Sequence, residues 1–157
     1  MAERARTHSF EATSEGISAA DAWVEQVGQE LAFTERQVFG ARLCVAEIAA
    51  NVHEHGGRFA EPARMSLSVR REGRSLEMEI TDSGRPFDPT SVPDIPRSQT
   101  IEAAPIGGLG LHLVRSYASA MRYHHDGDRN HVVLQIPDAA GQSSSDVARG
   151  HDPASTG

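Results

Sequence analysis

The sequence contains no lysine, because all fifteen basic residues among its 157 are arginines. This absence excludes a Walker A lysine, the ATP-contacting lysine of ordinary protein kinases and every Schiff-base mechanism. If the protein binds phosphate groups, it must do so without lysine. Backbone amides are then the natural phosphate ligands.

Other features are scarce as well. Cys44 is the one cysteine, which excludes an internal disulfide and a cysteine-rich zinc site, and we expect it to be a small buried residue. No apolar run approaches the roughly 18 residues that a membrane span requires, and "MAERARTHSF" is not followed by the apolar segment of a secretory signal. The net charge of -7 argues against general nucleic-acid binding, which depends on clustered cations. We therefore expect a cytoplasmic protein that binds neither membranes nor nucleic acid directly.

The length of the chain predicts one domain with one main site. We expect the folded domain to cover residues 1–137. The remaining residues, 138–157, are small and polar ("DAAGQSSSDVARGHDPASTG") and predict a flexible tail.

Two helices are predicted in the first half of the chain, after a short strand over residues 7–13. The first helix has Ser18 as its candidate N-cap. The second opens at Thr34, with Gln37 three residues later as a capping box, and runs to Gly56-Gly57.

The second half begins with two alternating segments, "MSLSVRRE" and "LEMEI", which predict a hairpin with "GR" in its turn. A proline-rich loop follows, then a third helix over residues 109–123, and then a turn and the last strand within 124–137. The order β-α-α-β-β-loop-α-β-β predicts an α+β fold, a two-layer α/β sandwich whose mixed, mostly antiparallel sheet carries its helices on one face.

Glu47, Asn51 and His55 lie four residues apart and form one polar stripe along the second helix. They are either an ordinary solvated helix edge or groups that border a cleft. In the second case the amide oxygen suits Mg²⁺, and the carboxylate one turn away is placed to take a proton from an attacking hydroxyl or water.

Two further motifs have a structural and a functional interpretation. "DSG", residues 82–84, is either a simple turn or an adenine contact, in which Asp82 accepts a hydrogen bond and Gly84 lets a flat ring approach the backbone. "GGLGLHLV", residues 107–114, is either a glycine-capped loop or a helix start whose free N–H groups bind phosphate oxygens. It lacks the third glycine of a dinucleotide-binding fingerprint.

Taken in order, "EIAANVHEH", "DSGRPFDP" and "GGLGLHLVR" resemble the N, G1 and G2 boxes of the GHKL superfamily of ATP-binding domains. Within that superfamily the chain is similar to the stand-alone anti-sigma factor serine/threonine kinases. The resemblance implies ATP and Mg²⁺ as cofactors, Glu47 as general base, Asn51 as Mg²⁺ ligand and a lid over residues 85–106. It further implies nucleotide contacts by His55, Asp82, Gly84, Phe87, Gly107, Gly108, Leu109, Gly110 and Leu111.

The resemblance also implies a function: a kinase that binds a sigma factor and phosphorylates an anti-sigma factor antagonist, in the arrangement called partner switching. Because the family tends to dimerise, a homodimer is among the expected states. One alternative is a non-catalytic regulator of the same fold whose partner affinity is gated by nucleotide, and another is an interaction protein that has lost ATP. Arg85, Arg97 and Arg115 are the candidates to replace lysine at the phosphates, and the sequence does not choose among them.

Overall fold

The computed structural model describes residues 3–55, 61–93 and 108–139. Their order agrees with the predicted one, with a short 3₁₀ helix inside the loop. The elements are β1 (Arg6–Glu11), α1 (Ser14–Glu30), α2 (Glu35–His55), β2 (Arg64–Glu72), β3 (Ser75–Asp82), η1 (Pro89–Ser91), α3 (Gly108–Tyr117), β4 (Ala120–Asp126) and β5 (Arg129–Ile136).

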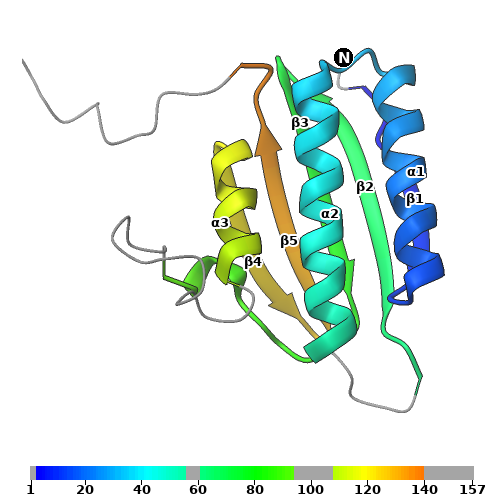
Figure 1. The fold of residues 1–157 in the computed structure, drawn as a ribbon, viewed down its shortest axis with the longest axis vertical. Coiled ribbons are helices and arrows are strands. Elements are labelled where there is room, and N and C mark those ends of the chain that lie inside the picture. Colours follow the sequence, from blue (N-terminus) through cyan, green and yellow to red (C-terminus); the bar gives the residue numbers. More distant parts are fainter. Residues whose placement is uncertain (1–2, 56–60, 94–107, 140–157) are drawn as a thin grey trace, which may run out of the picture.

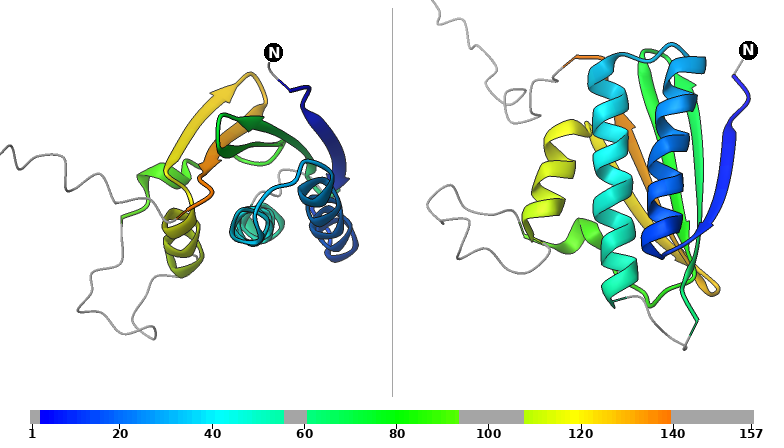
Figure 2. Two further views of the ribbon diagram at one scale, coloured as in Figure 1. Left: turned by 90° about the horizontal axis from the view of Figure 1, so that it is seen from above. Right: turned by 45° about the vertical axis from the view of Figure 1, so that its right-hand side comes forward.

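The five strands form one sheet in the order β1-β2-β3-β5-β4, and each neighbouring pair is antiparallel. The α-helices of the described residues lie together on one face of this sheet (Figures 1 and 2). The predicted α+β two-layer architecture is therefore confirmed.

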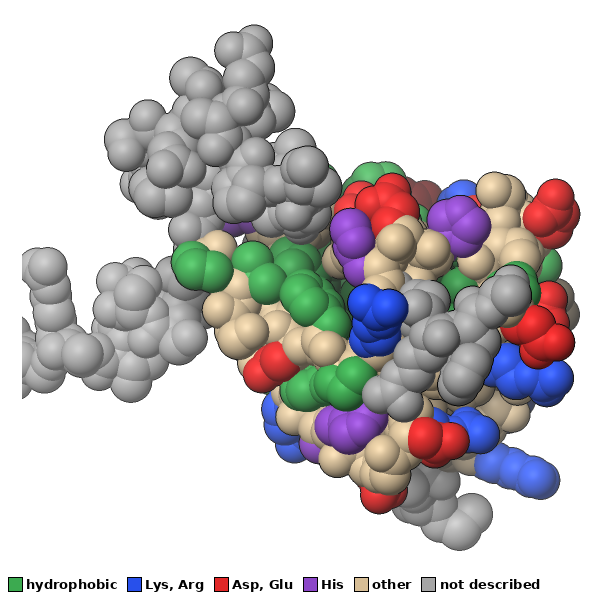
Figure 3. All heavy atoms as spheres, turned by 90° about the horizontal axis from the view of Figure 1, so that it is seen from below, with side chains coloured by type: hydrophobic (Ala, Val, Ile, Leu, Met, Phe, Trp, Pro, Cys, Tyr) green, Lys and Arg blue, Asp and Glu red, His purple; other side chains and the backbone are tan. Residues whose placement is uncertain are grey.

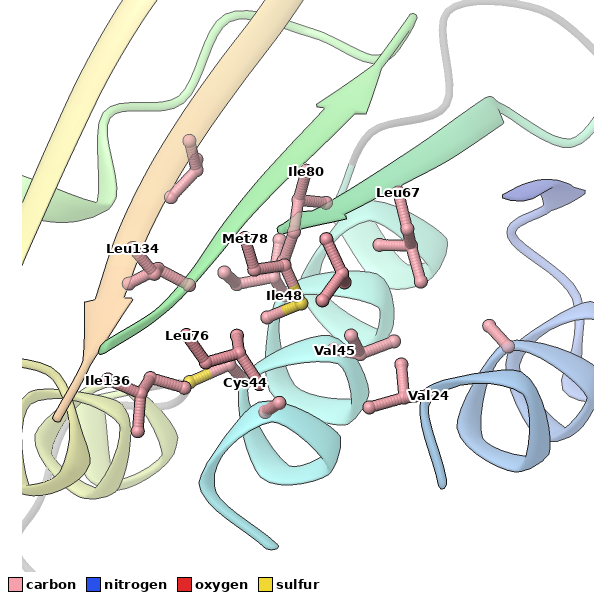
Figure 4. Packing of buried hydrophobic residues seen from close by; sticks show 14 of the residues in the cluster. Val24, Cys44, Val45, Ile48, Leu67, Leu76, Met78, Ile80, Leu134 and Ile136 are labelled. Atoms are coloured by element: carbon pink, nitrogen blue, oxygen red, sulfur yellow. The ribbon is translucent and has the colours of Figure 1, made fainter. Parts of the chain in front are cut away.

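The core lies between the sheet and α2, where apolar side chains from alternate strand positions meet those of the helix (Figure 4). In the β2–β3 hairpin, Leu67 pairs with Ile80 and Val69 with Met78, and all four are buried. Their neighbours point to the uncovered face, as the alternation predicts. Gly73 has a φ of 59°, which the two-residue turn requires and which glycine adopts without strain.

The capping box of α2 is confirmed. The Gln37 side chain accepts a hydrogen bond from the Thr34 backbone N–H at 3.0 Å, and Thr34 Oγ1 accepts one from the Gln37 N–H at 3.2 Å. The prediction for α1 was wrong: Thr13, not Ser18, is the N-cap, because its side chain accepts a hydrogen bond from the Gly16 N–H. The strand before it ends at Glu11.

The predicted third helix is too long. It ends at Tyr117, and residues 120–126 form strand β4 instead of its last turns. Met121 fits a helical stripe and an alternating strand equally well. Pairing with β5 decides for the strand, with Met121 and Tyr123 packed on the core and Arg122 exposed between them. His124–Asp126, expected in a turn, belong to the same strand.

Parts of the predicted lid and tail lie within the described residues. Residues 85–93 are described, whereas the other lid residues and the tail from residue 140 lie outside the described ranges, as does the C-cap Gly56-Gly57. Asp138, placed in the tail by its composition, forms an ion pair with Arg74 at 2.6 Å. No helix formed by the described residues is long and apolar enough to cross a membrane.

Candidate functional site

Three elements that carry predicted site residues end or begin at the same end of the molecule. The C-terminal end of α2, the end of β3 and the start of α3 all lie at the lower end in Figure 1. Figure 3 looks at this end, where acidic, basic and histidine side chains are interspersed with exposed hydrophobic ones. We refer to Glu47, Asn51, Asp82, Gly84 and Gly110 as the candidate site.

Glu47 on α2 lies directly against Gly110 in the first turn of α3. A Cβ atom placed on Gly110 would be 1.9 Å from Glu47 Oε2 and 2.6 Å from Glu47 Cδ, far inside van der Waals contact. Only glycine therefore lets the start of α3 approach this carboxylate as it stands. The structure thus brings together two residues that the sequence placed in separate motifs.

Asn51 follows Glu47 by one helical turn and is also partly buried. No residue within the described ranges forms a hydrogen bond with its side-chain amide, so the amide oxygen is available to a ligand. His55 is placed differently. It is the last residue of α2, its side chain is 64% exposed, and its Nε2 lies 3.6 Å from Glu54. Its contact with a nucleotide stays a prediction.

Asp82 ends β3 in a buried position, 5% exposed. Its Oδ1 accepts hydrogen bonds from the Gly84 N–H at 2.8 Å and from Asn130 Nδ2 at 2.9 Å. Both bonds reach Oδ1, which leaves Oδ2 without a hydrogen-bond partner among residues 3–55, 61–93 and 108–139. A buried carboxylate with one oxygen fixed and the other open is suited to accept a hydrogen bond from a ligand.

Asn130 is a further candidate site residue, which the motifs did not reveal. It pairs with Asp82 across the β3–β5 ladder, and its Nδ2 also lies 3.3 Å from Gly84 O and 3.0 Å from Arg85 O. Its Oδ1 accepts a hydrogen bond from the Tyr123 hydroxyl at 2.7 Å. Asn130 therefore fixes both Asp82 and the turn after it. The signal in the sequence is an asparagine at an inward-facing position of "NHVVLQI", where its neighbours on that face are apolar.

Burial is the main influence on Asp82 and raises the pKa of its carboxyl above the ordinary range, while hydrogen bonds from Asn130 and Gly84 act in the opposite direction. The Asp82 carboxyl of the folded protein therefore stays protonated over a pH range in which the Asp82 carboxyl of the unfolded chain is ionised. Consequently, stability falls as the pH rises through that range, which begins at the ordinary aspartate pKa.

Replacing Asp82 with asparagine should remove this part of the pH dependence. The amide oxygen still accepts the bonds from Gly84 and Asn130, but the side chain no longer titrates. The free energy of unfolding of Asp82→Asn, measured in denaturant from about pH 4 to 7, should depend less steeply on pH than that of the parent. Above the pH range in which the parent loses the Asp82 proton, we expect the variant to be the more stable protein. Equal slopes for the two proteins would contradict the effect of burial.

The remaining predicted contacts fall into three groups. Gly108 and Leu109 begin α3, so their backbone N–H groups belong to its unpaired first turn. The Leu111 side chain is 1% exposed and is therefore not available to a ligand, whereas the Phe87 side chain is 51% exposed. Gly107 lies outside the described residues.

The structure describes two of the three candidate arginines. Arg115 Nη2 lies 3.1 Å from Pro89 O and 2.5 Å from Val92 O, so it holds backbone carbonyls. Arg85 is exposed, and Arg97 lies outside the described residues.

These residues fit a magnesium nucleotide. The open Asp82 Oδ2 matches an exocyclic amine, and the first turn of α3 offers backbone donors for phosphate oxygens. The unpaired Asn51 amide supplies one oxygen ligand of the kind that Mg²⁺ prefers.

The sequence profile of the histidine kinase-like ATPase domain family matches residues 10–136. The chain is 29% identical over 131 residues to the serine/threonine-protein kinase BtrW of Bordetella bronchiseptica, and the match covers 82% of this chain and 92% of that protein.

Among solved structures, that of the RsbU and RsbW domains of a Mycobacterium tuberculosis protein has a TM-score of 0.59 at 13% identity. The match covers 86% of this chain and 33% of that longer chain, so this chain spans about a third of it. At this identity the likeness shows a shared fold.

Proposed function

Since this chain belongs to the histidine kinase-like ATPase domain family, we propose that it is a Mg²⁺-ATP-dependent serine/threonine protein kinase. We further propose that it binds a sigma factor and, in alternation, phosphorylates a small anti-sigma factor antagonist in the cytoplasm. A relative named as a serine/threonine-protein kinase and a structural neighbour with an RsbW domain support this proposal.

The observation that carries the proposal is the contact between Glu47 and Gly110. It brings a carboxylate, a candidate general base, to the end of a helix whose first N–H groups are candidate phosphate ligands. A base is useful in phosphoryl transfer only when it stands next to the phosphate-binding groups.

Each residue of the candidate site then has a chemical task. Asp82 Oδ2 accepts a hydrogen bond from the adenine amine, and Gly84 leaves room for the ring. The backbone N–H groups of Gly108–Gly110 bind phosphate oxygens in place of lysine. Glu47 accepts the proton of the attacking serine or threonine hydroxyl.

Asn51 would hold Mg²⁺ through its amide oxygen, together with phosphate oxygens and water. When bound, the ion neutralises the charge that develops on the phosphates. The chain contributes by positioning these groups and by electrostatic stabilisation.

The proposal is tested by capturing the partner. The tagged full chain is incubated with host lysate with and without Mg²⁺-ATP, the bound proteins are identified, and each is purified and incubated with radiolabelled ATP. We expect a sigma factor and a small antagonist to be captured in a nucleotide-dependent way, and the antagonist to be labelled on serine or threonine. Capture of neither protein, with no labelled product, would contradict the proposal.

A further inference from the structure

Segment 85–93 follows β3 and is the described part of the predicted lid. Polar contacts hold it in place at several points. At its start, Asn130 donates hydrogen bonds to Gly84 O and Arg85 O. Further along, the Asp88 carboxylate caps η1 by accepting a hydrogen bond from the Thr90 N–H at 2.8 Å. The first half of the segment is thus attached to the adenine side of the candidate site.

The second half of the segment is attached to a different element. Arg115 lies on α3, five residues after Gly110, and its Nη2 is 3.1, 3.5 and 2.5 Å from the carbonyl oxygens of Pro89, Thr90 and Val92. Nη2 has two N–H groups, enough for the two shorter contacts, with Pro89 O and Val92 O, and Thr90 O is a longer third neighbour. Arg115 therefore links segment 85–93 to the helix whose first turn forms the phosphate side of the site.

After Pro89, little of the second half of the segment is buried. A hollow of about 510 Å³ lies beside it, bordered by residues 90–93 on one side and by residues 118–121 with Arg115 on the other. Within η1, Pro89 is buried, whereas Thr90 and Ser91 are exposed. Hydrogen bonds from a charged donor to backbone acceptors are stronger than neutral ones, so loss of Arg115 should release this half of the segment.

We propose that Arg115 is a positioning residue of the nucleotide site, an inference that rests on the function proposed above. By fixing residues 89–92 to α3, it sets the separation between the adenine side, at Asp82 and Gly84, and the phosphate side, at the start of α3. A ligand that spans both sides gains from this fixed separation, whereas a ligand that uses one side does not.

The test compares Arg115→Met and Arg115→Lys with the parent, using Arg122→Met as control. Arg122 is an exposed arginine on strand β4. It lies between Met121 and Tyr123, which pack on the core, and its side chain is on the other face of the sheet. Binding of Mg²⁺-ATP, adenosine and inorganic tripolyphosphate is measured by competition, and hydrogen exchange of residues 85–93 is followed in nucleotide-free protein. A melting curve of each variant confirms that it is folded.

We expect Arg115→Met to bind ATP about tenfold more weakly while adenosine and tripolyphosphate bind within about twofold of the parent. Exchange in residues 85–93 should be faster. Arg115→Lys should be intermediate, because lysine keeps the positive charge but its ammonium does not reproduce the position of Nη2, and Arg122→Met should match the parent.

Three results would overturn the proposal: ATP affinity unchanged in Arg115→Met, equal loss of all three ligands, or loss of both ATP and tripolyphosphate binding with adenosine binding unchanged, which identifies a direct phosphate ligand. If the parent itself binds no ATP, the proposed function fails. The exchange data then decide separately whether Arg115 holds the segment.

Discussion

Replacing Glu47 with glutamine should leave Mg²⁺-ATP affinity nearly unchanged and lower phosphate transfer to the captured antagonist by about 10²- to 10⁴-fold. The amide has nearly the same size as the carboxylate, so the contact with Gly110 is kept, but the amide does not accept the hydroxyl proton. Calorimetry with Mg²⁺-ATP and a single-turnover transfer assay measure the two quantities separately.

Glu35→Gln is the matched control, because Glu35 is an exposed glutamate in the first turn of the same helix, at the opposite end from the candidate site. It should transfer phosphate like the parent. Equal transfer by Glu47→Gln and the parent would remove Glu47 from its role as base. If neither protein transfers phosphate and partner binding still depends on ATP, the protein is the nucleotide-gated regulator considered as an alternative.

Gly110→Ala should have a comparably large effect on transfer with little effect on stability. The new methyl group meets Glu47 Oε2 and Cδ, which form the far end of a flexible side chain, so the carboxylate moves and the helix stays in place. Alanine also favours a helix over glycine by up to about 1 kcal/mol, which offsets the crowding. Because a shift of about 1 Å in a catalytic group costs on the order of 100-fold in rate, we expect a loss of that size.

A double-mutant cycle with Glu47→Ala separates crowding from other effects of the methyl group. Without the Glu47 side chain, Gly110→Ala has nothing to displace, so it should cause no further loss of transfer and should raise the melting temperature slightly. Independent, additive losses in transfer would show that Gly110 acts through another contact. Melting curves of all four proteins complete the cycle.

The elements predicted from local rules were largely found. The Thr34–Gln37 capping box and the β2–β3 hairpin depend on residues close in sequence, so side-chain chemistry and alternation suffice to place them. The α1 cap shows the limit of such rules. Thr13 and Ser18 are both acceptable N-caps, and the end of the preceding strand at Glu11 decides for Thr13.

The misplaced end of α3 has a similar origin. Residues 118–123 satisfy two periodicities, and the partner that selects the strand, β5, lies further along the chain. Asn130 was missed for the same reason: its role depends on the register that sets it opposite Asp82. The motifs predict which residues form the candidate site, whereas Asn130, which orients Asp82, comes from pairing across the sheet.

We propose that one end of this fold binds a magnesium nucleotide through main-chain amides, with no lysine. Isothermal titration of the full chain with Mg²⁺-ATP tests this claim, with Asp82→Asn in parallel as a folded variant whose open acceptor oxygen is replaced. We expect saturable one-site binding to the parent and loss of binding in the variant. No heat and no thermal shift for the parent at millimolar nucleotide would contradict the claim.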